Sequence, residues 1–282
     1  MLFTAALGYA WVRAGRPLDG AVLTPLVTEV GSPCLILATL LKAKIEPAAF
    51  ASMALAAFIA ITLFLTVGAI ALRTFRLRIR TYLPSVAFPN AGNLGLPLSL
   101  YAFGPKGLAY AIVFFAFSQV GSFTIGQAIA AGRANWVVLA RMPLIYAVAL
   151  GVAASTLNLE LPGWLRNFIA LLGNMTVPLM LLMLGASIAR LRVASLGRSL
   201  CVSGLRIGIG LAVGVGVSTA LGMTGVPKAV LVMQCAMPVA IFSYVFAQQW
   251  GNDPEEVAGL VVVSTAATVF TAPLLLNFLL AM

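Results

Sequence analysis

The chain has 282 residues, of which 62% are hydrophobic and only 9% are charged. Soluble domains carry about 25% charged residues, so this composition excludes an ordinary soluble fold and indicates a helical membrane protein surrounded by the lipid bilayer. The net charge of +10 does not indicate nucleic acid as a partner, because the basic residues lie in short loops between apolar runs. The chain has no histidine and its three cysteines stand apart, so we expect no enzyme, no cofactor and no metal site.

Apolar runs long enough to cross a bilayer recur along the whole chain. We expect ten spans, at about residues 1–14, 18–41, 47–72, 79–103, 107–131, 135–157, 163–189, 197–221, 227–249 and 256–281. A helix from Met1 to Val12 rises only about 18 Å, whereas the hydrocarbon core is about 30 Å thick. The first span is therefore either thinly embedded or the truncated end of a helix whose natural start lies upstream.

The distribution of Lys and Arg among the loops predicts the orientation of the spans. With the N-terminus outside, 11 basic residues fall in inner loops and 5 in outer loops, Arg206 being set aside as intramembrane. Cytoplasmic loops carry the excess of positive charge in membrane proteins. We therefore expect a multi-pass protein of the cell's inner (plasma) membrane, with both termini extracytoplasmic and the basic cluster of residues 73–80 in the cytoplasm.

The fourth expected span contains an interruption at residues 87–97, which read AFPNAGNLGLP. Each of its two prolines lacks an N–H group, and its ring clashes with the preceding helical turn. In lipid, a broken backbone persists only where protein or a water-filled cavity satisfies the freed polar groups. An interruption this polar at membrane depth therefore predicts a binding site.

The ninth expected span carries a matching interruption at residues 236–244, AMPVAIFSY. The prolines keep a common register in the two halves of the chain: Pro89 follows Pro33 by 56 residues, and Pro238 follows Pro178 by 60. This register predicts two domains of five spans each.

The two expected domains are residues 1–131 and residues 132–282. Because five is an odd number, the second domain enters the membrane upside down relative to the first. Broken segments at corresponding positions of such inverted-topology repeats indicate the binding site of a secondary transporter.

The two interruptions resemble the crossover segments of the auxin efflux carrier family. Residues 89–97 followed by Phe103-Gly104 resemble the first crossover, and residues 237–249, MPVAIFSYVFAQQ, resemble the second. The connection between the fifth and sixth spans is short, which resembles the compact prokaryotic members. The resemblance implies an all-α polytopic membrane protein of ten helices in two inverted five-helix repeats, with the fourth and ninth spans crossing as broken helices. It also implies secondary transport of a small organic anion.

Each broken helix opens the N-terminus of a half-helix at the midplane, where free N–H groups and a partial positive charge favour an anion such as a mono- or dicarboxylate. We expect these half-helices at residues 94–103 and 239–249. The predicted substrate-binding residues are Pro89, Asn90, Asn93, Gly95, Pro238, Ser243 and Tyr244. Neither crossover contains an arginine, and a carboxylate between two helix N-termini needs none. The alternative is that the polar residues only cap the broken ends, which applies above all to Asn90 beside Pro89.

Two ionisable residues lie inside expected spans, where a charge is costly and by default functional. Glu29 is the candidate for proton coupling, because burial disfavours the charged form of a carboxyl group and prepares it to bind a proton. The alternative is that Glu29 lies near cytoplasmic water or pairs with a cation. Arg206 lies about two turns into the eighth span, and we expect its side chain to extend to the inner interface.

The coupling ion stays open at this level. Protons can act through Glu29, sodium can bind the free carbonyls of the crossovers, and an anion driven by voltage needs neither. A sodium-coupled or cation/proton antiporter of related crossover architecture is the alternative function. It needs carboxylates at the crossover, whereas Asp19 and Asp253 lie near loops. A glycine series in the eighth span, residues 204–216, indicates either close helix packing or a homodimer surface.

Overall fold

The structure is a computed structural model, and it describes residues 2–43, 47–134, 137–157, 159, 161–191 and 193–280. Within these residues the chain is helical, and the only β-type pairing is an isolated bridge. The helices, with η for π-helical segments, are α1 (Leu2–Arg13), α2 (Gly20–Pro25), η1 (Leu26–Gly31), α3 (Ser32–Ala43), α4 (Pro47–Thr74), α5 (Ile79–Ala87), η2 (Ala91–Gly95), α6 (Leu96–Gly121), η3 (Ser122–Gly126), α7 (Gln127–Ala131), α8 (Val137–Ala140), α9 (Pro143–Thr156), α10 (Gly163–Arg190), α11 (Leu196–Ala220), α12 (Gly225–Cys235), α13 (Ile241–Trp250) and α14 (Pro254–Leu280).

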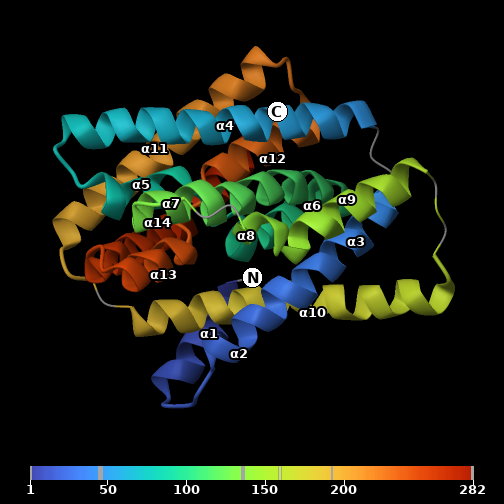
Figure 1. Ribbon diagram of the computed structural model, residues 1–282, viewed down its shortest axis with the longest axis horizontal. Helices are drawn as coiled ribbons and strands as arrows, with labels where there is room; N and C mark the ends of the chain where they lie inside the picture. The colour runs from blue at the N-terminus through green and yellow to red at the C-terminus, as the bar shows by residue number, and fades with distance from the viewer. Residues whose placement is uncertain are drawn as a thin grey trace.

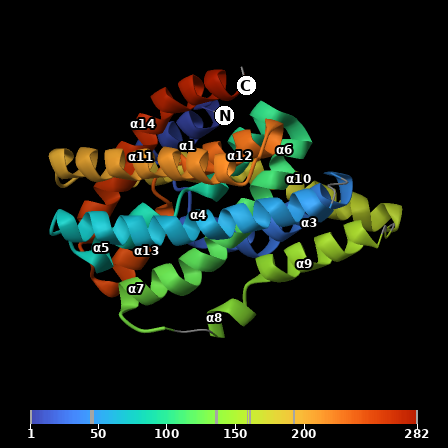
Figure 2. The same cartoon turned by 90° about the horizontal axis from the view of Figure 1, so that it is seen from above.

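The long helices α4 and α10 run roughly along the longest axis of the molecule, and α11 crosses this direction obliquely behind α4 (Figure 1). They belong to two groups of packed helices. In the first, which we call the α10 group, α1 and α3 pack on α10, and α9 packs on α3. In the second, the crossover group, α4 lies beside α11 (Figure 2), α11 packs on α12 and α14, and α5, α6, α7 and α13 complete the unit.

Six helices in the described part of the chain are long and apolar enough to cross a membrane. They are Val22–Lys42, Ala48–Thr74, Ala91–Ala131, Gly163–Arg190, Leu196–Ala220 and Pro254–Leu279. The prediction of an all-helical, multi-pass membrane protein is thus confirmed, whereas helix length alone does not give ten spans. The expected first, sixth and ninth spans contain shorter helices, and α6 runs through a bend at Gly104 (φ 65°, ψ −163°) where the sequence predicts two spans.

The exterior of the molecule is apolar in the way that a lipid-facing surface requires. Phe270 and Leu274 on α14 and Leu171 on α10 each have at least 70% of their surface exposed. Polar side chains such as Arg206 and Gln234 are instead fully buried. Polar groups at membrane depth face the interior of a helical bundle, so this distribution agrees with the prediction of a helical membrane protein.

Two of the three π-helical segments end just before a proline. Ser32-Pro33 follows η1, and Leu96-Pro97 follows η2. A turn widened to bonds between residues i and i+5 accommodates a residue that has no N–H to donate. In η2, the N–H of Gly95 makes such a bond to the carbonyl of Asn90, at 3.1 Å. Pro97 therefore lies within a helix, and the interruption is shorter than the sequence predicts.

The helix α1 packs along α10 through two glycines. A Cβ atom added to Gly8 would overlap the backbone carbonyl of Leu182, and one added to Gly185 would overlap that of Ala5. Small residues allow two helix backbones to approach this closely in a membrane. The short first helix is therefore held by a helix from the second half of the chain.

The glycine series of α11 divides between two uses. Gly210 and Gly214 lie against α12, where added Cβ atoms would meet its backbone or Cys235, whereas Gly204, Gly208 and Gly216 face open space. Close packing, one of the two expectations for this series, therefore accounts for two of its members. A homodimer surface stays a prediction for the others.

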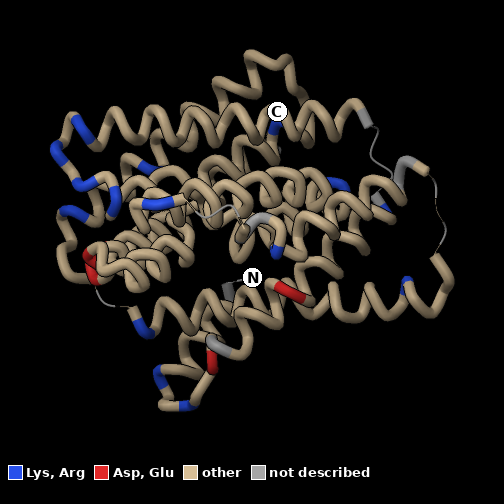
Figure 3. The backbone as a smooth tube through the Cα atoms, viewed as in Figure 1, with Lys and Arg blue, Asp and Glu red and all other residues tan. Residues whose placement is uncertain are grey.

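Lys and Arg gather at the end of the molecule where α4 leads into α5 (Figure 3). Two ion pairs at the start of α5 and α11 join these helices to the start of α14: Arg78 with Asp253 at 2.9 Å and Arg198 with Glu256 at 2.8 Å. The Arg78 side chain is largely exposed, and exposed pairs contribute about 0–1 kcal/mol. The Arg78–Asp253 ion pair thus adds little to the stability of this charged end of the crossover group.

Candidate functional site

The two interrupted helices meet inside the crossover group. Residues 88–90 separate α5 from η2, and residues 236–240 separate α12 from α13. Pro89 and Val239 form an isolated antiparallel bridge between the two interruptions. The breaks that the sequence predicts in the fourth and ninth spans are therefore present, and they lie in contact.

Backbone hydrogen bonds at the bridge satisfy the groups that the breaks release. The N–H of Asn90 donates to the carbonyl of Pro238 at 2.7 Å, and the N–H of Ala240 donates to that of Phe88 at 3.4 Å. Buried backbone at membrane depth needs such partners. Each interruption thus stabilises the other, and neither would persist alone in lipid.

A serine on α14 supplies a third support. The N–H of Val239 donates to Oγ of Ser264 at 3.1 Å, and Ser264 is fully buried. Sequence analysis did not single out Ser264. Its only signal was a hydroxyl within an apolar helix, and such hydroxyls commonly bond carbonyls of their own helix backbone.

The first half-helix begins at Asn90, whose side chain does not cap it. The backbone carbonyl of Asn90 accepts from Gly95, while its side chain is 4% exposed and its Nδ2 atom has no partner in the described part of the chain. The capping alternative for Asn90 is therefore wrong. A buried amide donor aimed at no protein group is instead available to a bound molecule.

Gly95 holds the two crossovers close together. A Cβ atom at this position would overlap the side-chain amide of Gln234, near the end of α12. Gln234 donates through Nε2 to Oγ of Ser99 at 3.2 Å, and Ser99 donates to the carbonyl of Gly95 at 2.8 Å. Gly95 therefore serves close approach of the backbone, and the amides of Asn90 and Gln234 both lie at the crossing.

The other predicted site residues lie in the first turns of the two half-helices. Ser243 is buried and its backbone N–H donates to the carbonyl of Ala240 at 3.1 Å, while Asn93 and Tyr244 are partly exposed. No hydrogen bond within the described residues joins these three side chains to the opposite crossover. The structure thus brings Pro89, Asn90 and Pro238 into direct contact, with Gly95 against Gln234, and leaves the other three beside the contact.

Arg206 lies at the crossing and not at the membrane interface, so the expectation that it extends outward is wrong. Its side chain is fully buried, its Nη2 donates to the carbonyl of Cys235 at 2.9 Å, and its guanidinium lies 4.6 Å from the ring centroid of Phe64. Gly210, one turn further along α11, lets α12 end beside the arginine. The crossovers themselves contain no arginine, but a neighbouring helix supplies one.

Glu29 lies on an exposed side of η1, so the protein does not bury it as the proton-coupling expectation assumes. Asp253 and Glu256 lie at the start of α14, in the ion pairs with arginines described above. No cluster of three potential metal ligands occurs among the described residues. The part of the crossing that the structure describes contains a buried cation and amides but no carboxylate.

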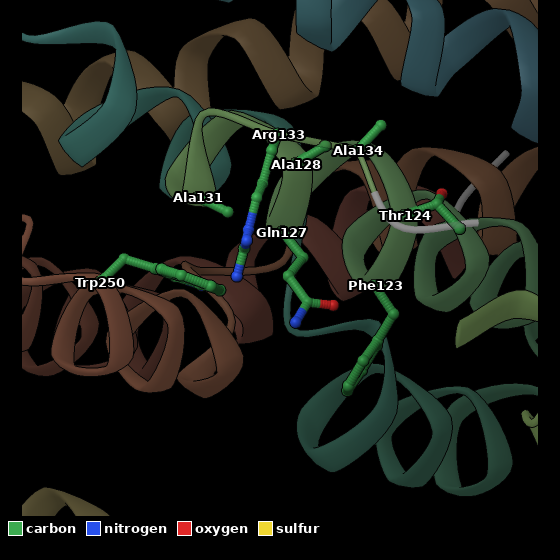
Figure 4. Close-up of a pocket in the computed structure, with 8 residues that line it drawn as sticks. All are labelled: Phe123, Thr124, Gln127, Ala128, Ala131, Arg133, Ala134 and Trp250. Carbon is green, nitrogen blue, oxygen red and sulfur yellow. The ribbon is translucent and has the colours of Figure 1, made fainter. Parts of the chain in front are cut away.

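A polar cavity of about 270 Å³ opens beside α13 (Figure 4). Gln127 projects into it between Phe123 and Arg133, and the Arg133 guanidinium lies 5.4 Å from the ring centroid of Trp250. Phe123 also packs edge-on against Phe242 in the first turn of α13, with ring centroids 4.9 Å apart. The cavity therefore approaches the second half-helix and ends at an aromatic contact.

A second, apolar cavity of about 160 Å³ lies beside the first half-helix. Leu94 and Leu98 line it from the crossover group together with Thr265 of α14, while Leu181 and Leu184 line it from α10. The boundary between the α10 group and the crossover group is thus hollowed next to the crossing.

The chain is similar to known membrane transport proteins. A family model described as "Membrane transport protein" matches residues 127–276, more than half of the chain. A probable auxin efflux carrier component 5b of Oryza sativa subsp. japonica is 27% identical over 144 residues, 49% of this chain and 39% of that protein. An uncharacterized transporter of Methanothermobacter thermautotrophicus is 26% identical over 196 residues, 67% of this chain and 65% of that protein.

The chain spans less than two thirds of the length of either relative. The family model and the archaeal relative indicate a transporter and not an enzyme. The resemblance carried by the two crossover motifs is confirmed, and the chain belongs to the membrane transport protein family, which is the family of the auxin efflux carriers.

Proposed function

We propose that this protein is a secondary transporter that carries a small organic anion, such as a mono- or dicarboxylate, across the inner membrane by alternating access. The observation that carries the proposal is the bridge between Pro89 and Val239. It puts the starts of two half-helices, η2 with α6 and α13, beside one buried point. Broken helices that cross in this way form the substrate sites of secondary transporters.

The chemistry of the crossing favours an anion. Helix N-termini present free N–H groups and partial positive charge, and the described part of the crossing has no carboxylate to repel an anion. The proposed substrate-binding residues are Pro89, Asn90, Asn93, Gly95, Pro238, Ser243 and Tyr244. A sodium-coupled or cation/proton antiporter needs carboxylates at this place, so no observation favours that alternative.

We further propose that residues 1–131 and 132–282 are inverted five-helix repeats that make up ten spans. Helix packing supports this: α1 packs on α10 as α9 packs on α3, α4 packs on α5 as α11 packs on α12, and α4 packs on α6 as α11 packs on α14. In each comparison, the second helix pair is obtained from the first by replacing every helix with its counterpart in the other half of the chain. The bridge itself joins nearly corresponding residues, because Pro89 corresponds to Pro238 in the register of the crossover prolines and Val239 is the next residue.

Alternating access then consists of movement between the two helix groups. The whole crossing lies within the crossover group, and the two cavities lie along its flanks, one toward α13 and one toward α10. Rocking of one group against the other would open the crossing to each side in turn. The basic end of the molecule is the cytoplasmic end in this proposal, since cytoplasmic loops carry the excess of Lys and Arg.

Coupling to protons through Glu29 stays part of the proposal, with a specific requirement. Glu29 is exposed on η1 in the α10 group, so a change in its surroundings must accompany movement of the crossover group. Transport driven by voltage alone needs no such change. Glu29→Gln separates these two modes.

The test is uptake of radiolabelled acetate, butyrate, succinate and benzoate into proteoliposomes under imposed proton, sodium and voltage gradients. We expect at least one carboxylate to accumulate, and we expect the double variant Asn93→Ala, Ser243→Ala to lower its uptake by at least about tenfold, the cost of two lost hydrogen bonds. Thr62→Ala, an exposed hydroxyl on α4, is the control and should transport normally. Absence of uptake of every carboxylate under every gradient would contradict the proposed anion site.

A further inference from the structure

Arg206 is a fully buried cation with no carboxylate partner in the described part of the chain. The ion pairs recorded there use Asp253 and Glu256, at the end of the crossover group. Removing an ion from water is costly, and an unpaired buried charge is destabilising. Burial of Arg206 therefore lowers the stability of the protein, and no described residue supplies its counter-charge.

The arginine lies at the negative end of a half-helix. Its Nη2 donates to the carbonyl of Cys235, the last residue of α12 and three residues before Pro238. A helix C-terminus carries partial negative charge, so Arg206 neutralises the end of α12. Free carbonyls at this end were the sequence-based expectation for a sodium site, and the guanidinium already occupies one of them.

Two nitrogen atoms of the guanidinium remain without a hydrogen-bond partner in the described part of the chain. These atoms, Nε and Nη1 of Arg206, are buried. Nδ2 of Asn90 and Oε1 of Gln234, at the same crossing, are also buried without partners. Oε1 of Gln234 is an acceptor, whereas Nδ2 of Asn90 is a donor, as are Nε and Nη1 of Arg206. Buried polar groups in proteins are normally satisfied, so these unpaired donors at the crossing indicate a bound molecule.

We propose that Arg206 is the fixed positive charge of the substrate site, and that the carboxylate of the transported anion supplies its missing counter-charge. This proposal rests on the proposed function and adds a binding residue that the crossover motifs do not contain. It also assigns to a side chain the place that a sodium ion would take at the end of α12. Transport through the crossing is then independent of sodium.

A purely structural arginine predicts a different outcome from a ligand-binding one. If Arg206 served only to neutralise α12, its loss would lower stability and leave anion binding unchanged. If it serves the anion, an apolar side chain of similar length removes a desolvation cost, so the empty protein keeps or gains stability while anion binding is lost. The substitution Arg206→Met therefore separates the two roles.

The experiment uses the full chain purified in detergent and then reconstituted. The melting temperature (Tm) is measured against rising acetate, butyrate, succinate and benzoate for wild type, Arg206→Met, Arg206→Lys and the exposed control Arg141→Met. In Arg206→Met we expect the Tm without anion to stay at or above that of wild type and the affinity for the stabilising anion to fall at least about 30-fold. Arg206→Lys keeps the charge and should retain part of the affinity, and the control should match wild type.

Uptake in sodium salts is then compared with uptake in N-methyl-D-glucamine salts, and wild type should transport equally in both. Unchanged anion affinity in Arg206→Met, or a saturable sodium requirement in wild type, would overturn the role of Arg206 while leaving the proposed function standing. A wild-type protein that neither binds nor transports any carboxylate would overturn the proposed function, and the assignment of Arg206 with it.

Discussion

The two crossovers have the same backbone arrangement but different chemistry. The first resumes after three residues in a π-helical segment and carries the amides of Asn90 and Asn93, whereas the second resumes after five in an ordinary α-helix and carries apolar residues such as Val239. The charge at the second crossover comes from Arg206 on another helix. The comparison teaches that the two halves contribute unequally to one site: the first supplies the amides of Asn90 and Asn93, whereas the second supplies one amide, Gln234, and the cation Arg206.

The same division appears at the centre of the crossover group. Gly68 of α4 faces Val86 much as Gly210 of α11 faces the end of α12. Four residues before these glycines lie Phe64 and Arg206, the aromatic ring and the cation that lie against each other. The first half supplies Phe64 to that pair, and the second half supplies Arg206. An aromatic face attracts a cation, so the ring is a suitable neighbour for an arginine that lacks a carboxylate.

The largest expected effect follows from a side chain added where backbones touch. Gly210→Val would push into the carbonyl of Cys235, a backbone atom, and we expect destabilisation of about 3 kcal/mol or more, seen as loss of folded protein in detergent. Gly95→Val meets the flexible amide of Gln234 and should cost less. Gly208→Val faces open space and is the control; equal losses in all three would contradict the assignment of close packing to Gly210.

A smaller effect separates structural from functional polar groups at the crossing. Ser264→Ala leaves the buried N–H of Val239 without an acceptor, which costs about 1–3 kcal/mol, read as a lowered Tm. Asn90→Ala removes an amide that binds no protein group, so we expect an unchanged Tm and reduced anion uptake. A reversed pattern, with Asn90→Ala unstable and Ser264→Ala inactive but stable, would show that the two residues have exchanged roles.

Weaker still is the contribution of the charged end of the group. Asp253 accepts hydrogen bonds from Arg78 and from Thr81, which joins α5 of the first half to α14 of the second. The Arg78 side chain is 78% exposed, so Asp253→Asn should lower stability by about 1 kcal/mol or less, and the loss should shrink in high salt. Chemical denaturation at two salt concentrations measures it, and a salt-independent loss would mean that the pair is shielded from solvent.

Glu29→Gln is expected to leave Tm unchanged, because Glu29 lies on an exposed side of η1. If coupling uses this carboxyl group, the variant should lose the part of uptake that a proton gradient drives and keep the part that voltage drives. The exposed control Asp19→Asn should keep both parts. Uptake that follows voltage equally in wild type and in Glu29→Gln would show that transport uses the crossovers without Glu29.

The interruptions were predictable because their causes are local. Proline and glycine affect the helical turn in which they lie, so residues 87–97 and 236–244 predict a helix break independently of the tertiary structure. The extent of the first break was not predictable, since η2 widens to accommodate Pro97 and shortens the gap to residues 88–90. That widening depends on Gly95, which the neighbouring crossover holds in place.

The burial of Arg206 could not be read from its position along the eighth span. A residue two turns from the interface can extend outward or fold inward, and the choice depends on which helix ends beside it. Cys235 ends α12 at that point, 29 residues later in the chain. The periodic signal in α11 was Gly210 and Gly214 on the same face as Arg206, which marks the side on which another backbone approaches. Ser264 was missed for a similar reason, because its partner is set by the crossing.

The reciprocal glycine contact between α1 and α10 has a consequence for biosynthesis. Gly8 and Gly185 are 177 residues apart, and ribosomes add about 5–20 residues per second, so α1 emerges about 9–35 s before the partner against which it packs. During that interval this helix of 12 residues lacks α10, the helix on which it packs most extensively in the described part of the chain. The helix α1 therefore reaches its final packing only after α10 has been made, and the membrane insertion machinery or lipid must shelter it until then.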